Sequence, residues 1–174
     1  MNVVPFKFTI EGQEIDAYLT EKNWELVLKA INKNKKTGYE RVPFGEIYWR
    51  DTNLGYVQRE NDERCDEDED MYKVANYYSS KEVAENNSRA DKLIRQLRRF
   101  AVEHRSKELN WNDFCQRKFY IGYDCKRKVF DVECDTDYIT SHTVYFDSYE
   151  SAEDAISVFS SELKWYFTEY KDSL

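Results

Sequence analysis

A nine-residue pattern occurs twice in this chain and restricts its fold more than any other feature of the sequence. Residues 77–85 and 145–153 both follow the order Tyr, aromatic, x, Ser, x, Glu, x, Ala, Glu. The aromatic pair is typical of a strand end, the serine can cap a helix, and the helix dipole favours the first glutamate. The alanine is small enough for a helix to contact a sheet closely. The repeat therefore predicts an α+β fold in which helices pack on antiparallel sheets.

The spacing of apolar residues predicts a separate unit at the amino terminus, over 1–38. Apolar and polar residues alternate over 6–10 and again over 15–19, which is typical of a β-hairpin. Thr20 is placed to cap a helix that keeps a helical apolar spacing as far as Ile31. The first unit is thus predicted to be ββα.

Two further units, 39–109 and 110–174, are each predicted to hold a β-hairpin, another strand and a packing helix. The strands are expected at 47–49, 56–57, 72–78, 119–123, 130–134 and 143–146, and the helices after Ser80 and after Ser148. Because the repeated pattern lies at the same place in both units, they can be related halves. Repetition of a structural unit does not indicate an activity.

Acidic residues are concentrated in one short segment. The chain has a formal net charge of −8, and eight of the eleven residues from 60 to 70 are acidic. We call these residues the acidic segment: Glu60, Asp62, Glu63, Asp66, Glu67, Asp68, Glu69 and Asp70. Such a block repels itself, so a solvated loop is expected. It can be a solubilising loop, or it can bind a basic surface of a partner. Calcium binding is the third interpretation, but an EF-hand loop starting at Asp66 has Met71 where glycine is required.

A basic stripe lies in the predicted helix that follows: Arg89, Lys92, Arg95, Arg98, Arg99, Arg105 and Lys107. Basic residues at helical spacing usually form a solvated face, and attraction to the acidic segment would neutralise both. Nucleic-acid contact is the alternative, although the net negative charge of the chain argues against a dedicated nucleic-acid binder.

The sequence shows no motif for catalysis or for a cofactor. It has two histidines, five glycines, and no phosphate-binding loop, dinucleotide motif or nucleophile elbow, so we expect neither an enzyme nor a bound cofactor. The four cysteines form no paired zinc motif. A zinc site from Cys115, Cys125, Cys134 and His142 stays open, although Cys134 alternates with apolar residues as a buried side chain would. No apolar stretch is long enough to cross a membrane, so a cytoplasmic protein is expected.

Several short motifs together resemble a group of small phage and prophage proteins of Firmicutes. They are Arg41-Val42-Pro43-x-Gly45-Glu46, Asn76-Tyr77-Tyr78-Ser79-Ser80-x-Glu82-x-Ala84, Arg99-Phe100-Ala101, Asn110-Trp111-Asn112-Asp113, Tyr120-Ile121-x-Tyr123 and Tyr145-Phe146-x-Ser148. The resemblance runs from about Arg41 to the carboxyl terminus and carries over no catalytic residue. It implies a mobile-element origin, a host cytoplasmic location and a non-enzymatic role.

This resemblance suggests an anti-CRISPR protein that binds a Cas9-type effector and blocks DNA loading or cleavage. Such nucleases hold nucleic acid in positively charged channels, which an acidic surface can occupy. The partner-binding residues are then expected to be the acidic segment together with Tyr72. The alternative function is a phage regulator that binds nucleic acid through the helix over 89–107.

Overall fold

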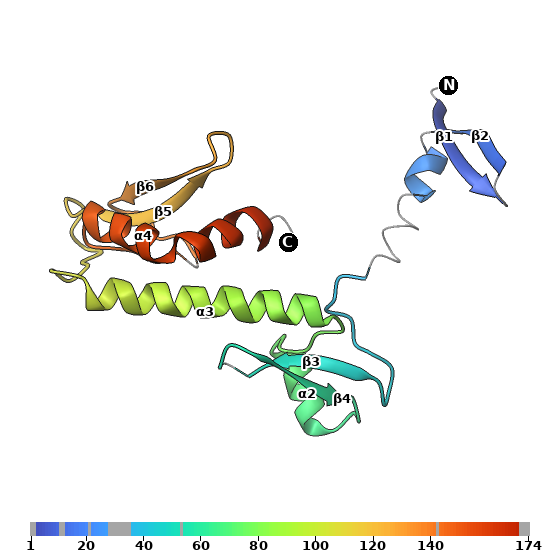
Figure 1. Ribbon diagram of the computed structural model, residues 1–174, viewed down its shortest axis with the longest axis horizontal. Helices are drawn as coiled ribbons and strands as arrows, with labels where there is room; N and C mark the ends of the chain where they lie inside the picture. Colours follow the sequence, from blue (N-terminus) through green and yellow to red (C-terminus); the bar gives the residue numbers. More distant parts are fainter. Residues whose placement is uncertain are drawn as a thin grey trace. The chain divides into compact units, whose positions relative to one another are not determined.

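The computed structural model describes residues 3–10, 13–20, 22–27, 36–52, 54–141 and 143–170, and it has the α+β architecture predicted from the sequence (Figure 1). The chain divides into two compact units, Met1–Glu40 and Arg41–Leu174. The second unit therefore contains both of the segments that the sequence divides at residue 110. Each unit is described by itself below.

The first unit contains the predicted amino-terminal hairpin. Strand β1 (Val3–Ile10) pairs with β2 (Gln13–Thr20) in an antiparallel register that places Val3 opposite Thr20. A helical stretch over 22–27 follows, and the Thr20 hydroxyl accepts a hydrogen bond from the backbone N–H of Asn23 at 3.3 Å. The predicted cap is thus present. The remainder of the predicted helix, including Ile31, lies outside the described residues.

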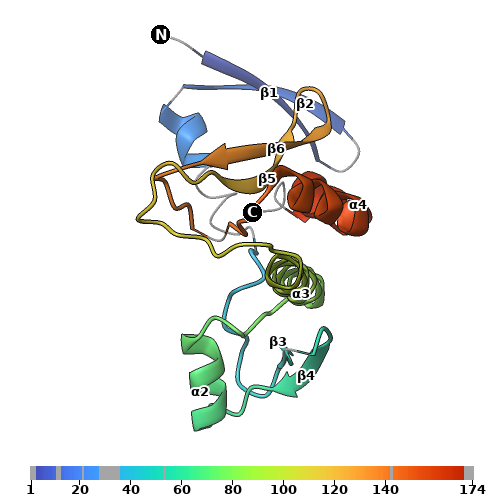
Figure 2. The ribbon, with the colours of Figure 1, turned by 90° about the vertical axis from the view of Figure 1, so that its left-hand side faces the viewer.

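The second unit is built on both sides of one long helix, α3 (Lys81–Glu103). On one side lie the hairpin of β3 (Ile47–Asp51) and β4 (Val57–Asn61) and the short helix α2 (Asp66–Lys73). On the other side lie α4 (Tyr149–Trp165), which a π-helical turn η1 (Tyr166–Tyr170) extends, and the hairpin of β5 (Lys118–Asp124) and β6 (Val129–Asp135). Helix α4 packs between α3 and this hairpin (Figures 1 and 2).

The repeated pattern forms the same strand-to-helix junction in both places. Tyr78 exchanges two backbone hydrogen bonds with Trp49, of 2.8 and 2.9 Å, and Phe146 exchanges two with Phe119, of 2.9 and 2.7 Å. The expected strands at 72–78 and 143–146 are therefore single bridges rather than full strands. Residues 72 and 73 belong instead to the last turn of α2.

Both helices after the junction begin at the predicted serine. Ser80 accepts a hydrogen bond from the backbone N–H of Val83 at 3.4 Å, and Ser148 accepts one from Ser151 at 3.1 Å. Ala84 and Ala152, the alanines of the pattern, have no solvent exposure. The pattern thus encodes a cap and a close helix contact, as capping chemistry predicts.

Removal of either cap is expected to destabilise the protein measurably. Ser80→Ala and Ser148→Ala should each lower the free energy of unfolding by about 1 kcal/mol, because a backbone N–H at the helix start loses its acceptor. Urea unfolding measures this loss. Ser157→Ala, at an exposed position within α4, is the control and should change stability by less than about 0.5 kcal/mol. Equal effects at all three serines would contradict the capping role.

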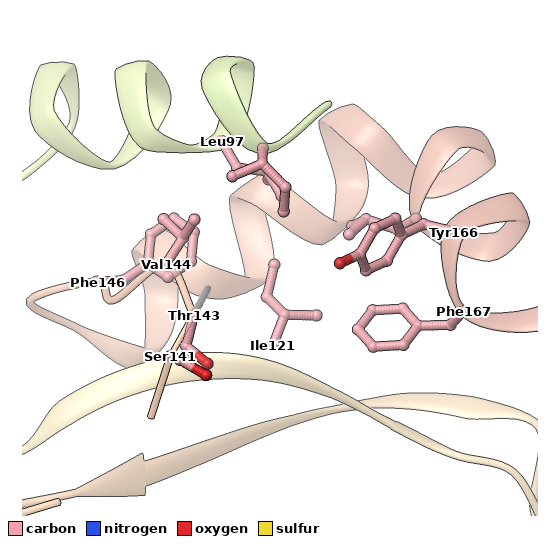
Figure 3. Close-up of a pocket in the computed structure, with 10 residues that line it drawn as sticks. Leu97, Ile121, Ser141, Thr143, Val144, Phe146, Tyr166 and Phe167 are labelled. Atoms are coloured by element: carbon pink, nitrogen blue, oxygen red, sulfur yellow. The ribbon is translucent and has the colours of Figure 1, made fainter. Parts of the chain in front are cut away.

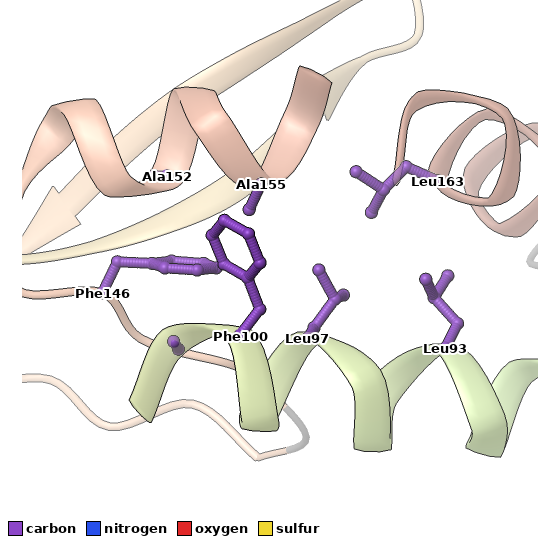
Figure 4. Packing of buried hydrophobic residues seen from close by; sticks show 8 residues of the cluster. Leu93, Leu97, Phe100, Phe146, Ala152, Ala155 and Leu163 are labelled. Carbon is purple, nitrogen blue, oxygen red and sulfur yellow. The ribbon is translucent and has the colours of Figure 1, made fainter. Parts of the chain in front are cut away.

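The main core lies between α3 and α4 (Figure 4). Leu93, Leu97 and Phe100 of α3 point toward Leu163 of α4 and toward Phe146 at the junction. Helical spacing in the sequence predicts that the packed face of this helix holds Ala90, Leu93, Ile94, Leu97, Phe100 and Ala101. All of these are buried except Ile94, which is partly buried against the main core. A smaller core of Val42, Tyr48, Tyr77 and Met71 lies in the half that contains α2.

The acidic segment is not the continuous loop that its charge predicts. Its first residue, Glu60, lies in β4, Asp62 and Glu63 follow the strand, and the residues from Asp66 onward lie in α2. Four consecutive acids, 66–69, occupy the first turn of α2, where the helix dipole favours negative charge. The Asp68 carboxylate also accepts hydrogen bonds from the backbone N–H groups of Glu63 at 2.9 Å and Cys65 at 3.2 Å. These contacts offset the repulsion that a loop prediction assumes.

Candidate functional site

Asp62 of the acidic segment is an interior residue with no solvent exposure. Its carboxylate pairs with Arg41 at 3.0 Å and Arg64 at 3.1 Å, and it accepts a 2.7 Å hydrogen bond from the Tyr77 hydroxyl. Burial favours the neutral acid, but the hydrogen bonds from Arg41, Tyr77 and Arg64 outweigh it and lower the pKa of Asp62 to about 2. Asp62 is therefore a charged structural residue.

Asp68 has a similar interior position on α2, with 4% of its surface exposed. It accepts a 2.9 Å hydrogen bond from the Tyr48 hydroxyl, and the Tyr48 ring stacks on Tyr77 with a centroid separation of 4.1 Å. Burial, together with the neighbouring carboxylate, raises the pKa of Tyr48, and the same causes raise the pKa of Tyr77 to about 12. Both tyrosines therefore stay neutral donors. Asp62 and Asp68 hold this core together, so the prediction that they contact a partner is wrong.

Two further acids of the segment are largely paired with arginines. Glu60 of β4 contacts Arg50 of β3 at 3.0 Å, and Glu69 of α2 contacts Arg41 at 2.6 Å. Arg41 thus connects Asp62 to Glu69, and these two carboxylates raise the pKa of its guanidinium. Within the described residues, the positive partners of the acidic segment are Arg41, Arg50, Arg64 and Lys73, and none of them belongs to the basic stripe.

The other four acids face solvent, and we call them the outer acidic face: Glu63, Asp66, Glu67 and Asp70. Glu67 approaches Arg50 at 3.3 Å and Asp70 approaches Lys73 at 3.3 Å, and both carboxylates remain more than 60% exposed. Such exposed pairs contribute about 0–1 kcal/mol and exchange readily with other partners. Glu63 and Asp66 have no ion pair within the described part of the chain.

Tyr72, the remaining predicted binding residue, lies at the end of α2 and is 42% exposed. Its ring packs edge-on against Tyr77 at 5.4 Å, and the Arg41 guanidinium lies 5.2 Å from its centroid. A half-exposed tyrosine held in one orientation is a common contributor to protein interfaces. The structure therefore holds the Tyr72 ring against Tyr77 and Arg41 at the end of α2. The structural partners Arg41, Tyr48 and Tyr77 have no signal in the linear spacing of the acids.

The basic stripe divides into paired and unpaired residues. Arg89 pairs with Glu162 at 2.8 Å and lies 3.9 Å above the Trp165 ring, so it joins α3 to α4. Lys92, Arg95 and Arg98 are exposed, and the described residues provide no ion pair for them. These three cations are available to an anionic ligand, and so is Lys107, which lies beyond the end of α3 and is likewise exposed without an ion pair among the described residues.

An apolar pocket of about 210 Å³ opens between α3, β5, η1 and the segment before α4 (Figure 3). Leu97, Ile121 and Phe167 supply much of its apolar lining, and the polar side chains at the pocket are the hydroxyls of Ser141, Thr143 and Tyr166. The pocket is continuous with the main core, since Leu97, Phe146 and Leu163 belong to both. None of the described residues that line it carries a carboxylate or an amine.

The cysteines do not form a metal centre in the part of the chain that is described. Cys115, Cys125 and Cys134 are exposed and free, and no three His, Cys, Asp or Glu side chains cluster there. Cys134 was expected to be buried, and this expectation is wrong, because its side of β6 faces solvent at that end of the strand. The proposed fourth ligand, His142, lies outside the described residues.

Among the described helices, none is both long enough and apolar enough to span a bilayer. Scans against protein-family models, curated proteins and solved structures each found no match to this chain.

Proposed function

We propose that this protein is a phage-encoded, non-enzymatic inhibitor that binds a bacterial defence nuclease of the Cas9 type through the outer acidic face. The observation that carries the proposal is that the acidic segment contains both buried acids that stabilise the fold and exposed acids that face solvent. Asp62 and Asp68 fix α2 to the tyrosine core, while Glu63, Asp66, Glu67 and Asp70 remain exposed. Helix α2 and the loop before it thus present four carboxylates that no buried contact of the described residues uses.

The density of these charges supports a basic channel as the target. Helix α2 has eight residues and is about 12 Å long, and it holds three of the four carboxylates, Asp66, Glu67 and Asp70, or about one charge per 4 Å. One strand of DNA carries about one phosphate per 3.4 Å. A channel that binds a nucleic-acid backbone therefore meets a similar charge density on this helix. The exposed ion pairs with Arg50 and Lys73 can be exchanged for partner cations at little cost.

Neutralising the outer acidic face should abolish most of the inhibition. The variant Glu63→Gln, Asp66→Asn, Glu67→Gln, Asp70→Asn loses four pairings worth about 0.5 kcal/mol each, so binding should weaken about 30-fold. Cleavage of target DNA by the guide-loaded nuclease, titrated with the inhibitor, measures this change. The effect should shrink as salt rises, since the contacts are screened.

The matched control removes charge elsewhere. Glu150→Gln, Asp154→Asn alters two exposed acids of α4, and its inhibition should stay within about twofold of the original protein. A four-acid variant that inhibits as well as the original protein would contradict the proposal. Urea unfolding of each variant separates a lost contact from a lost fold.

The second candidate function, nucleic-acid binding, is favoured by the unpaired cations Lys92, Arg95 and Arg98 on the exposed side of α3. A labelled duplex and a labelled single strand, followed by fluorescence anisotropy at several salt concentrations, test it. Binding that falls steeply with salt and is lost in Lys92→Gln, Arg95→Gln, Arg98→Gln would favour this function over the inhibitor.

A further inference from the structure

A second pocket, of about 370 Å³, lies at the carboxyl end of α3 and has a different chemistry from the apolar pocket. Arg98 of α3 and Arg105, which follows the end of that helix, both line it. Trp111 lines it from the following loop, and Tyr145 and Asp147 line it from the junction before α4. We call it the arginine–aromatic pocket. It combines cations, flat aromatic rings and a buried carboxylate.

The two arginines are available to an anion. Arg98 is exposed, and the described residues give it no ion pair. Arg105 contacts Glu108 at 3.0 Å, but the Glu108 side chain is 81% exposed, so this pair is readily exchanged. The carboxyl end of a helix dipole carries about half a negative charge, which two guanidinium groups outweigh. Guanidinium groups also match the geometry of phosphate.

The aromatic rings of the pocket are held in place before any ligand binds. Trp111 packs edge-on against Tyr145 with centroids 4.9 Å apart. The Tyr145 hydroxyl accepts a 2.9 Å hydrogen bond from the backbone N–H of Thr140. The Lys118 ammonium lies 5.0 Å from the centroid of Trp111 and donates to two backbone carbonyls. Such rigid rings offer a surface on which a planar heterocycle can stack.

Asp147 supplies the most specific observation, because it is 98% buried and only half satisfied. Its Oδ2 accepts hydrogen bonds from the N–H and hydroxyl of Ser106, at 2.7 and 2.9 Å, and from the N–H of Lys107 at 3.1 Å. Its Oδ1 has no hydrogen-bond partner among the described residues. A buried acceptor without a donor costs about 1–3 kcal/mol. Ser151 Oγ in α4 is also buried and unpartnered, but Ser151 does not line this pocket.

We propose that the arginine–aromatic pocket binds a nucleoside phosphate whose base carries an amino group. The phosphate contacts Arg98 and Arg105, the base packs on Trp111 or Tyr145, and its amino group donates to Asp147 Oδ1. Because Oδ1 only accepts while Asp147 is ionised, a base that offers an amino donor fits better than uracil, whose single N–H lies between two carbonyl oxygens. This proposal does not rest on the inhibitor function, which uses α2.

Isothermal titration of the full chain with AMP tests the proposal, with UMP, adenosine and ribose 5-phosphate as comparisons. We expect AMP to bind at least about tenfold more tightly than any of the three, since each lacks one of the required groups. The absence of saturable binding up to about 10 mM AMP would overturn the proposal. Binding of a single-stranded oligonucleotide without binding of AMP would also overturn it, in favour of a nucleic-acid surface.

Two variants and one matched control locate the site. Arg98→Gln should weaken AMP binding about tenfold, whereas Arg95→Gln, an exposed arginine of α3 outside the pocket, should change it less than twofold. Asp147→Asn keeps an oxygen for Ser106 and Lys107 and replaces Oδ1 by an amide donor, so it should reduce the preference of AMP over UMP. Equal losses in Arg98→Gln and Arg95→Gln, or an unchanged base preference in Asp147→Asn, would contradict the assignment.

Discussion

Replacing Asp62 with alanine is expected to lower the free energy of unfolding by about 3–5 kcal/mol, the usual cost of removing one partner from a buried charge pair. The substitution leaves the Arg41 guanidinium with Glu69 alone and removes the acceptor of the Tyr77 hydroxyl. Urea unfolding at neutral pH measures the loss. Asp66→Ala, at an exposed position three residues before Glu69, is the control and should cost less than about 1 kcal/mol.

The pH dependence of stability gives a second readout of the same residue. The pKa of Asp62 is lowered to about 2 in the folded protein, whereas an unfolded aspartate titrates near 3.9. Its stabilising contribution is therefore complete above about pH 4 and is lost as the pH falls toward 2. Asp62→Ala should remove part of this acid sensitivity. Identical stability profiles for the variant and the original protein from pH 5 to pH 2 would show that Asp62 does not stabilise the fold through its charge.

Replacing Phe146 with alanine is expected to cost about 3–5 kcal/mol, because its side chain is 1% exposed and packs in the main core between α3 and α4. The backbone bridge to Phe119 does not depend on the side chain, so the loss reports packing alone. Thermal or urea unfolding measures it.

Phe114→Ala is the control for Phe146, because Phe114 is 67% exposed, and its effect should stay within about 0.5 kcal/mol. A cost below about 1 kcal/mol at Phe146 would contradict its place in the core.

The strand-to-helix junctions could be predicted from the sequence because their determinants are local. The capping serine and the buried alanine lie about one helical turn apart in the sequence. The structure has both features, with caps at Ser80 and Ser148 and buried alanines four residues after each. The apolar face of α3 follows from helical spacing alone, and Leu93, Leu97 and Phe100 confirm it. Local chemistry and the final packing agree in these segments.

Helix α2 could not be predicted because part of what offsets its repulsion comes from elsewhere in the chain. Arg41 and Arg50 lie 28 and 17 residues before Glu69 and Glu67, and no spacing rule connects them. The inward position of Asp62 depends likewise on the Tyr77 hydroxyl, fifteen residues away. The sequence therefore located the acidic segment but did not separate its buried carboxylates from its exposed ones.

Amide hydrogen exchange of the full chain, alone and with a purified guide-loaded nuclease of the Cas9 type, tests the central claim most directly. We expect slower exchange on complex formation over 63–73, which contains the outer acidic face and Tyr72, and little change over 92–105 of the basic stripe. Protection confined to 92–105, or exchange that is the same with and without the nuclease, would contradict the assignment of the outer acidic face as the inhibitory surface.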